Sequence, residues 1–554
     1  MTPEQLSDAI VAALAALERD GSVVLPDGIP SSVRVERPKV KEHGDYATNV
    51  AMQLGKRAGM NPRQLAQMLA DELSKNPGVA STEVAGPGFL NIRVEAGAQA
   101  ALAAQIVAAG ERYGTSDAFA GQTINMEFIS ANPNGPLHLG HTRWAAVGDA
   151  MARVLQAAGA SVTREFYIND RGTQMDAFGA SLMASAHGEP VPDDGYHGDY
   201  VHDLAAQIVR AGPQITELPE DEQLVAFREA GYELQLAEQQ RQLDAFRTHF
   251  DVWFSERSLH ESGAVEHAID KLRGQGHLYE SGGALWMRTT DFGDDKDRVL
   301  IRANGQESYF ASDTAYYVNK RERGFDRCVY LLGADHHGYI GRLYAMAACA
   351  GDEPDVNLQV LIGQLVKVFS GGQEVRLSKR SGALVTLQEL VDLIGVDSLR
   401  YTLSRYPNDS PLSLDVAVIT KQASDNPVFY VQYAHARLSS ILRNAADLGL
   451  APDVEAFDPA VLSHEREGDL LRALAELPRI VAQAAELREP HRVARYLEDT
   501  ASVFHRFYDV CRVLPQGDEE PTDLHRARLM LVEATRTVVA NGLGLLGVSA
   551  PERM

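Results

Sequence analysis

The chain has 554 residues, 45% of them hydrophobic, which is enough for roughly three domains with cores of their own. No stretch approaches the ~18 apolar residues of a membrane-spanning helix, so a membrane partner is not expected. The net charge of −24 argues against a protein that coats nucleic acid. Local basic patches could still bind RNA, because salt screens charges beyond about 10 Å.

The three cysteines are scattered and form no CxxC pair. We therefore expect neither a disulfide framework nor a structural zinc, and a cytoplasmic location fits this cysteine usage. The first residues, MTPEQLSDAIVAALAALERDG, predict an acidic-flanked amphipathic helix and do not have the pattern of a signal peptide.

Residues 1–105 are expected to form a small α/β domain. Apolar residues at three- and four-residue spacing predict three helices, over Pro3–Leu17, Tyr46–Lys56 and Pro62–Ser74. Alternating patterns predict strands at Val33–Val35 and at Glu83–Val94, the latter broken by the turn Gly86-Pro87-Gly88.

A basic run and an aromatic strand tip also lie in this domain. The basic residues are Arg34, Arg37, Lys39 and Lys41, and the tip carries Phe89 and Asn91. Stacking and amide hydrogen bonds are how proteins hold an unstacked RNA base. A solvated charged face beside an ordinary hairpin explains the same residues equally well.

The most informative stretch runs from Thr123 to Ala158. It reads as a strand, then a loop rich in proline and glycine, then a helix. His138 and His141 lie three residues apart in the first helical turn, hence on one face. A helix N-terminus attracts phosphate. Two surface histidines or half a metal site would also fit, although zinc partners at ligand spacing are missing nearby.

The string His138-Leu139-Gly140-His141 resembles the HIGH signature of class I aminoacyl-tRNA synthetases. The longer string from Glu127 to His138, EFISANPNGPLH, closely resembles bacterial-type arginyl-tRNA synthetases. Further strings that match this family in order and spacing cover nearly the whole chain: GDYATNVAM, GPGFLNIRV, GYHGDY, TDFGDDKDRV, YFASD and GADHHG.

Residues 106–411 are expected to form the catalytic domain. Strands predicted to alternate with helices favour a doubly wound, Rossmann-like parallel sheet. There is no GxGxxG and no Walker loop, so neither a dinucleotide site nor a P-loop is indicated. Residues 180–262 look like a mostly helical insertion. The predicted strands are Thr123–Ile129, Val162–Ile168, Cys328–Leu332 and Gln359–Phe369.

A second motif lies in a predicted hairpin that turns at Ser370-Gly371-Gly372. Its returning arm, Arg376-Leu377-Ser378-Lys379-Arg380, resembles the KMSKS loop of class I synthetases. It departs from that pattern at Arg376, Leu377 and Arg380. A basic loop alone is more often a solvated turn, but an HxGH motif upstream in the same domain favours the functional interpretation.

Residues 412–554 read as an all-helical bundle. This part resembles the family's anticodon-binding domain, and Tyr433, His435, Arg437 and Arg443 could face RNA. Aromatic residues at helical spacing are equally typical of a core. The predicted helices are Val428–Leu442, Leu470–Leu487, Val493–Leu514 and Leu524–Leu546.

The resemblance implies an enzyme that activates L-arginine with ATP and Mg²⁺, releases pyrophosphate, and transfers arginine to the terminal adenosine of its tRNA. No heptad seam indicates a dimer, so a monomer is expected. The implied catalytic residues are His138, His141 and Lys379. The implied ATP contacts are Pro133, Gly135, His138, Gly140, His141, Asp335, Ser378 and Lys379. The implied tRNA contacts are Phe89, Asn91, Tyr433 and Arg437.

The choice of amino acid also has a physical argument. A guanidinium is planar and always charged, so a selective pocket needs carboxylates in matching geometry. Glu127 lies in an apolar strand, where an unpaired carboxylate would be costly, and Asp313 follows Tyr309 by one helical turn. The resemblance assigns the arginine pocket to Glu127, Ser130, Asn132, Tyr309, Asp313 and His336.

Three rival functions remain at this stage. A class I synthetase for leucine, valine or isoleucine would need a large editing insertion, and one for glutamate would need cations in its pocket. A small-molecule adenylyltransferase would need neither terminal domain. A catalytically inactive RNA-binding paralogue would not need His138, His141 and Lys379.

Overall fold

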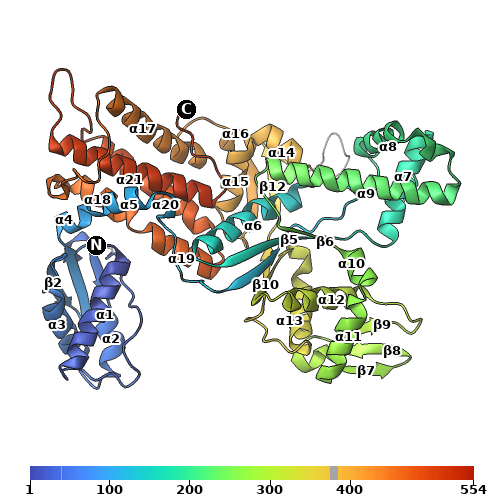
Figure 1. Ribbon diagram of the computed structural model, residues 1–554, viewed down its shortest axis with the longest axis horizontal. Helices are drawn as coiled ribbons and strands as arrows, with labels where there is room; N and C mark the ends of the chain where they lie inside the picture. The colour runs from blue at the N-terminus through green and yellow to red at the C-terminus, as the bar shows by residue number, and fades with distance from the viewer. Residues whose placement is uncertain (39, 375–384) are drawn as a thin grey trace.

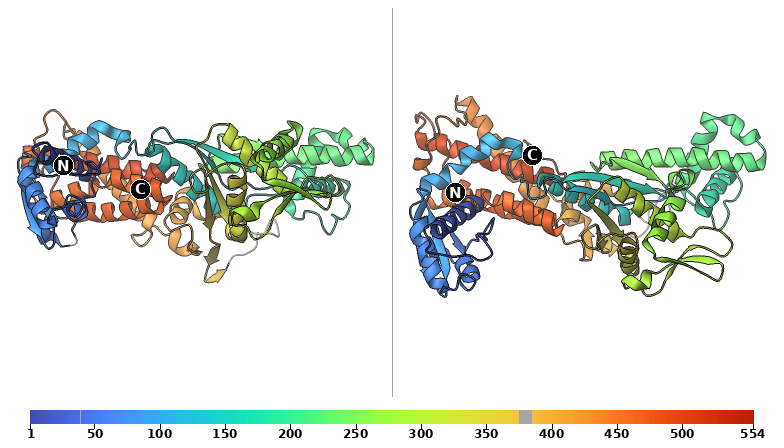
Figure 2. Two further views of the ribbon diagram at one scale, coloured as in Figure 1. Left: turned by 90° about the horizontal axis from the view of Figure 1, so that it is seen from below. Right: turned by 60° about the horizontal axis from the view of Figure 1, so that its bottom comes forward.

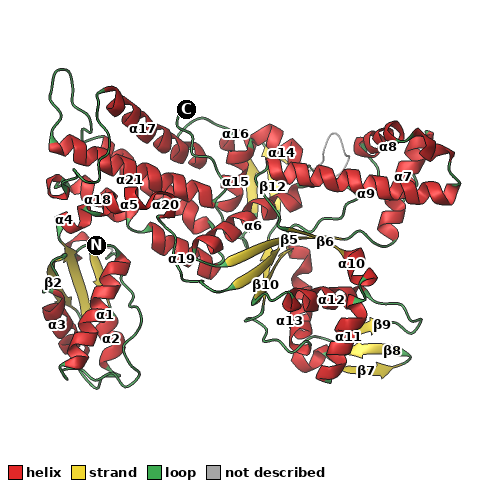
Figure 3. Cartoon of the chain, viewed as in Figure 1, coloured by secondary structure: helices red, strands yellow, loops and turns green. Residues whose placement is uncertain are grey.

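The computed structural model describes residues 1–38, 40–374 and 385–554 (Figure 1). The N-terminal domain and the helices α7–α9 lie at opposite ends of an elongated molecule (Figure 2). Strands gather in separate places along it, whereas the C-terminal part is helical (Figure 3). Within the described ranges, no helix has both the length and the apolar composition needed to cross a membrane.

The N-terminal domain packs three helices against an antiparallel sheet of order β1-β3-β2. Tyr46–Thr48 was predicted to begin a helix but forms strand β1, because Tyr46 pairs with Ile92 of β3 and its ring is fully buried. The predicted strand at Val33–Val35 does not form. The elements are α1 Pro3–Arg19, β1 Tyr46–Thr48, α2 Val50–Gly55, α3 Pro62–Leu73, β2 Val79–Ala85 and β3 Phe89–Val94. Two helices, α4 Ala96–Ala100 and α5 Leu102–Ala109, lead onward.

The catalytic core is a five-stranded, wholly parallel sheet of order β11-β10-β4-β5-β6. This confirms the doubly wound α/β fold predicted for the middle of the chain. The last strand, β6, lies inside the segment predicted to be mostly helical, because its short run Val-Trp-Phe-Ser gives little strand signal. The strands are β4 Thr123–Glu127, β5 Ser161–Ile168, β6 Val252–Ser255, β10 Arg327–Gly333 and β11 Leu358–Gly363.

Helices flank this sheet. The helix after β4 is α6, Leu139–Ala157, which is buried along most of its length. Between β6 and β10 the chain forms a small antiparallel sheet of order β7-β8-β9. The remaining elements here are α10 Glu256–Glu261, α11 Ala264–Gln275, β7 Leu278–Ser281, β8 Ala284–Met287, β9 Arg298–Ile301, α12 Tyr309–Glu322 and α13 Ile340–Cys349.

The segment Gln359–Phe369 was predicted as one strand and is two. The chain leaves the parallel sheet after Gly363 and starts β12, Val366–Ser370, in another sheet of order β13-β12-β14. The predicted turn at Ser370 is present, since β12 pairs antiparallel with β13, Gln373–Glu374. Helices α14 Leu387–Ile394 and α15 Val396–Ser404, strand β14 Leu412–Asp415 and helix α16 Val416–Ile419 follow.

A helical insertion follows β5. Helix α9 is long and α7 and α8 pack along it, with Phe178 and Phe227 in a small separate core. The insertion projects away from the sheet (Figure 1). Its helices are α7 Thr173–His187, α8 Asp199–Ala211 and α9 Glu220–Ala245.

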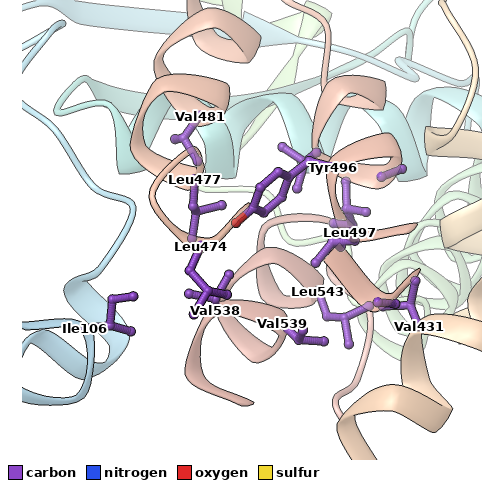
Figure 4. Packing of buried hydrophobic residues seen from close by; sticks show 14 of the residues in the cluster. Ile106, Val431, Leu474, Leu477, Val481, Tyr496, Leu497, Val538, Val539 and Leu543 are labelled. Atoms are coloured by element: carbon purple, nitrogen blue, oxygen red, sulfur yellow. The ribbon is translucent and has the colours of Figure 1, made fainter. Parts of the chain in front are cut away.

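The C-terminal bundle shares one hydrophobic core with the catalytic sheet. Ile124 and Phe128 of the sheet region belong to the same buried cluster as Val431, Leu497 and Val538 of the bundle, part of which is shown in Figure 4. Leu470–Leu487 was predicted as one helix and is two, with Pro478 in the first turn of the second. The helices are α17 Pro427–Asp447, α18 Glu465–Leu474, α19 Leu477–Leu487, α20 His491–Tyr508 and α21 Asp523–Leu545.

Arg400 of α15 locks the end of the chain to the catalytic domain. Its fully buried guanidinium donates to Asp149 Oδ2 at 2.5 Å, to Phe246 O at 2.8 Å and to Leu546 O at 3.1 Å. A side chain on Gly547 would collide with it, because a Cβ there would lie 2.2 Å from an Arg400 nitrogen. The buried charge is therefore paired and fully enclosed by three chain segments.

Candidate active site

The site lies where the strand order reverses. The chain runs from β4 to β5 and β6 on one side and later returns to β10 and β11 on the other. Ligands of open α/β sheets bind outside the carboxyl ends of the strands at such a switch point. The loop of residues 128–138 follows β4, and Ala334–Tyr339 follows β10. Both predicted ligand-binding loops are thus brought to one edge of the sheet.

The backbone directly after β4 is strained. Ile129 and Ser130 have φ values of 71° and 47°, in the left-handed region, which is especially unfavourable for a β-branched residue. Ser130 Oγ donates to Glu127 Oε1 at 3.0 Å and accepts from the Tyr167 N–H at 3.2 Å. Such conformations persist only where the surroundings enforce them, and they gather at functional sites.

The insertion clamps the rest of this loop. Gln239 of α9 is fully buried, and its amide donates to the carbonyls of Asn132 at 3.0 Å and Gly135 at 2.9 Å. The Tyr200 hydroxyl donates to Asn134 O at 3.0 Å. No local pattern indicates that a Gln-rich helix, 104 to 107 residues further along the chain, holds this loop in place. These contacts fix Pro133 and Gly135, two of the predicted ATP contacts, relative to the helix α6 that follows.

The two histidines form one unit at the start of α6. His138 is the N-cap: its Nδ1 accepts from the Gly140 N–H at 3.1 Å, and its own N–H donates to His141 Nδ1 at 3.3 Å. The rings lie with their centroids 3.9 Å apart. Because both Nδ1 atoms accept backbone hydrogens, both Nε2 atoms carry the proton and can donate.

These rings are held neutral. Burial lowers the pKa of His138, and burial together with repulsion from His138 lowers the pKa of His141 to about 3. Gly140 stays exposed between them, and a Cβ there would crowd the His138 ring at 3.0 Å. The start of α6 therefore offers two fixed, neutral donors beside the positive end of a helix.

Glu127 points to the face of β4 opposite α6, because its neighbours Met126 and Phe128 pack in one core with that helix. Glu127 is buried, and its Oε2 accepts from Lys320 Nζ of α12 at 2.6 Å. The sequence prediction placed Glu127 opposite a substrate guanidinium and did not foresee Lys320, which lies 193 residues away. No local pattern could have revealed this ion pair.

Asp313 also belongs to α12, and its Oδ2 accepts from the Tyr339 hydroxyl. Burial raises the pKa of Asp313 to about 6, and Glu127 adds to the rise, while Tyr339, Arg342 and His336 oppose it. Glu127 and Asp313 are linked through α12, because Asp313 belongs to this helix and Glu127 pairs with its Lys320. An acidic group so perturbed within a cleft is a strong functional candidate.

Three further residues were predicted to line the arginine pocket, and two of them, Tyr309 and His336, are exposed. Tyr309 opens α12 with 75% of its surface exposed, and it lines a hollow of about 580 Å³ with Glu256 and His260. His336 is exposed within the turn after β10. Asn132 donates to Gln174 at 2.7 Å, so its amide is oriented by the first turn of α7.

Three predicted ATP contacts remain, and only one of them lies within the described residues. Asp335 lies in the turn Ala334–Tyr339 after β10. Ser378 and Lys379 lie outside the described residues, as does the rest of the KMSKS-like string. No group of three or more His, Cys, Asp or Glu in a metal-binding arrangement occurs in the described part of the chain.

The predicted tRNA contacts lie at two distant places. Phe89 opens β3 with 40% of its surface exposed, whereas Asn91 is buried between β1 and β2 at 7% exposure. On α17, the Arg437 guanidinium lies 4.7 Å from the Tyr433 ring centre and donates to its hydroxyl at 2.6 Å. Both line a hollow of about 450 Å³ beside the chain's last residues.

His435 does not face this hollow. Its ring is 2% exposed and its Nδ1 lies 2.9 Å from Pro551 O, so the prediction that it could face RNA was wrong. Helical spacing places His435 on the face of α17 that the C-terminal segment covers. Arg443 lies on the edge of the hollow and donates to Glu552 O at 3.0 Å.

Comparison with known proteins now places the chain. A model of the class I tRNA synthetase (R) catalytic domain matches residues 103–194 and 213–401. With the sheet order and the HxGH helix start, this defines a class I aminoacyl-tRNA synthetase. The flanking segments match an arginyl-tRNA synthetase N-terminal domain over residues 4–94 and a DALR anticodon-binding domain over residues 431–554.

The chain belongs to the arginyl-tRNA synthetase family. It is 56% identical to the arginine–tRNA ligases of Paenarthrobacter aurescens and Frankia alni, and in each case the match covers all of both chains. The arginyl-tRNA synthetase structure from Thermus thermophilus matches with a TM-score of 0.76 over all of both chains, at 24% identity.

Proposed function

We propose that this protein is an arginine–tRNA ligase that uses ATP to form arginyl-adenylate and then esterifies the terminal adenosine of its tRNA with arginine. One observation carries the proposal most directly. At the end of a single strand, β4, a neutral donor pair suited to phosphate begins α6, and two carboxylates suited to a guanidinium, Glu127 and Asp313, lie on the side where α12 packs. Full-length similarity to arginine–tRNA ligases supports the same assignment.

The activation step needs positioning more than acid–base chemistry. A substrate carboxylate is ionised at neutral pH and can attack the α-phosphorus of ATP without a general base. The enzyme must align the two reactants and stabilise negative charge on the phosphates. His138 and His141 would donate through Nε2 to phosphate oxygens, and the N–H of Gly140 is engaged with His138, so it orients the ring. We assign Lys379 to the leaving pyrophosphate on the strength of its motif.

The arginine pocket is assigned to the carboxylate side. Asp313 and Glu127 would accept hydrogen bonds from the guanidinium, while Asn132 and Ser130 lie on the loop that leads toward the phosphate-binding side. Tyr309 would close over the pocket from its exposed position at the start of α12. A flat, donor-rich cation satisfies two carboxylates better than an ammonium does, so arginine should be favoured over lysine.

Magnesium is proposed to enter with ATP. Mg²⁺ prefers to keep several waters and to bind through substrate phosphates with few protein carboxylates. The ion would neutralise phosphate charge during pyrophosphate release.

The flanking domains are assigned to tRNA. We divide the chain at 1–105, 106–411 and 412–554, and we assign Phe89 and Asn91 to the outer corner of the tRNA. Tyr433 and Arg437 form a cation–π pair at a concave surface of the bundle, which suits stacking against an unpaired base. We further propose that the enzyme works as a monomer in the cytoplasm.

The decisive experiment is arginine-dependent exchange of labelled pyrophosphate into ATP, run with and without tRNA. We expect exchange with arginine and little with lysine or ornithine. Transfer of labelled arginine to tRNA tests the second step. Equal activation of lysine would refute the arginine assignment, and absence of any exchange in both conditions would refute the synthetase function itself.

A further inference from the structure

A buried network of charges lies directly beneath the carboxylate side of the site. Strand register places Tyr330, Glu127 and Glu165 side by side on β10, β4 and β5. Asn125, two residues before Glu127 on the same face of the sheet, donates to Glu165 Oε2 at 3.1 Å. Helix α12 lies over this row and contributes Tyr316 and Lys320.

Two carboxylates adjacent in a buried sheet would repel one another strongly unless cations offset them. Glu165 is satisfied by its own partners. Arg323 donates to both its oxygens at 2.6 and 2.9 Å, and the Tyr316 hydroxyl donates at 2.5 Å. Lys320 Nζ lies 3.9 Å from Glu165, too far for a hydrogen bond.

Lys320 is therefore the partner of Glu127. Its ammonium is fully buried, donates to Glu127 Oε2 at 2.6 Å, and lies 4.2 and 4.0 Å from the ring centres of Tyr316 and Tyr330. These rings enclose the charge without competing for the carboxylate. A buried ammonium costs several kcal/mol unless it is paired, and Glu127 provides that pairing for Lys320.

The two oxygens of Glu127 consequently have different tasks. Oε2 is held by Lys320 from below, while Oε1 meets Ser130 in the strained loop that follows β4. Ser130 is the first polar residue of the loop assigned to substrate. A guanidinium approaching from the ligand side would meet Oε1, with the direction of the carboxylate already set.

We propose that Lys320 is a positioning residue of the arginine pocket, which holds the Glu127 carboxylate in place so that a substrate guanidinium meets a preformed acceptor. This inference rests on the proposed function. It goes further because Lys320 is a cation that would help to bind a cationic substrate. Without the ammonium, Glu127 Oε2 would lose its hydrogen-bond partner in a buried site, and the carboxylate would no longer be fixed toward the pocket.

Other titratable and charged groups surround Glu127, so a test must distinguish the effect of Glu127 from theirs. Asp313 lies near enough to repel it, and its own proton uptake also weakens arginine binding. The titratable or charged groups around Glu127 are Lys320, Asp313 and Tyr316 on α12, Tyr167 and Glu165 on β5, and Tyr330 on β10. A double variant that retains Asp313 and its surroundings isolates the contribution of Glu127.

The main experiment compares Glu127→Gln with Glu127→Gln/Lys320→Met in the full-length protein by the Michaelis constant for arginine in pyrophosphate exchange. Glu127→Gln strands an ammonium beside the pocket, where it repels the guanidinium. Removing Lys320 as well should therefore lower the arginine KM again, by about three- to tenfold. Equal or weaker arginine binding by the double variant overturns the proposal. The comparison holds even if Lys320→Met alone does not fold.

The single variant gives a second readout. Lys320→Met should raise the arginine KM about tenfold, because the Glu127 carboxylate loses the group that holds it, while the ATP KM should stay within about twofold. Equal rises in both constants would indicate a purely structural role and would also overturn the proposal.

The matched control is Lys271→Met. Lys271 of α11 also pairs with a glutamate, Glu322, at 3.4 Å, but at the surface, so its removal should leave both constants unchanged. Pyrophosphate exchange by the wild type with arginine distinguishes a failure of the proposed function from a failure of the role of Lys320. If the wild type does not activate arginine, the proposed function fails. If it does and the variants lack the expected pattern, only the role of Lys320 fails.

Discussion

The phosphate side and the arginine side of the site are built on the same strand, but they use opposite electrostatics. At the start of α6, His138 and His141 are neutral rings fixed by backbone hydrogen bonds. On the side of α12, Glu127 is buried and paired with Lys320, and Asp313 is half-buried and accepts from the Tyr339 hydroxyl. A polyanion can be held by neutral donors and a helix end, whereas a buried cation needs formal negative charge. The two sides should therefore respond differently to charge and pH.

The largest effect is expected on the arginine side. Asp313→Asn keeps the side-chain shape but removes one charge facing the guanidinium. Loss of one member of a desolvated charge pair costs roughly 2–5 kcal/mol, so the arginine KM should rise by a factor between about thirty and several thousand while the ATP KM is unchanged. Arginine titration in pyrophosphate exchange measures this. An unaltered arginine KM would place Asp313 outside the pocket.

On the phosphate side, His141→Ala removes one fixed donor and the acceptor for the His138 N–H. We expect adenylate formation to slow by about 10²-fold, as for one preorganised donor, with arginine affinity little changed. Single-turnover kinetics tests the rate, and equilibrium arginine binding is the control. Loss of arginine binding in this variant would show that the phosphate side and the arginine side do not act separately.

Acid pH should separate the two sides in the wild type. Because the pKa of Asp313 is about 6, its charge is present above that pH and is lost below it, so kcat/KM for arginine should fall as the pH drops through 6. The ATP KM should remain level over this range, since His141 has a pKa of about 3 and is already neutral. In Asp313→Asn the bend near pH 6 should disappear. Its persistence would assign the titration to another group.

The smallest effect concerns a region remote from both sides. Phe89→Ala removes an exposed ring, and the KM for tRNA should rise by an amount that corresponds to about 1–3 kcal/mol of lost base stacking. The constants for arginine and ATP should not move. Asn91→Ala is the companion variant, and because Asn91 is largely buried, a thermal melt must accompany it. Normal tRNA kinetics for Phe89→Ala would make this loop a structural hairpin.

Local patterns predicted most of the fold. The Thr123–Ile129 strand, the helix after HxGH and the terminal bundle were evident because apolar spacing, prolines and glycines are local signals. Errors arose where tertiary pairing overrode propensity. Tyr46 joined a sheet although its neighbours suggested a helix, and four residues at Val252–Ser255 completed the central sheet from within a helical segment.

The sequence predicted which residues to look for in the candidate site, but it did not predict how they are arranged or which partners they contact. The sequence supplied His138, His141, Glu127 and Asp313 through motif resemblance. It could not supply the partners that give them their chemistry, because Lys320 reaches Glu127 from far along the chain and Gln239 reaches the loop from the insertion. The charges and tautomers of the site residues depend on such long-range contacts, and the local spacing of residues along the sequence does not reveal them.

The hydrophobic core shared by the sheet and the bundle has a consequence for synthesis on the ribosome. The N-terminal domain encloses its own core within its first 94 residues, so it can fold as soon as it emerges. Helix α6 covers Phe128 soon after β4, but α6 itself must wait for α19 and α21, the second of which ends at Leu545. At about 5–20 residues per second, the outer face of α6 stays uncovered for roughly 20 to 80 seconds. The nascent chain should therefore depend on chaperones that bind exposed apolar surface through the middle of its translation.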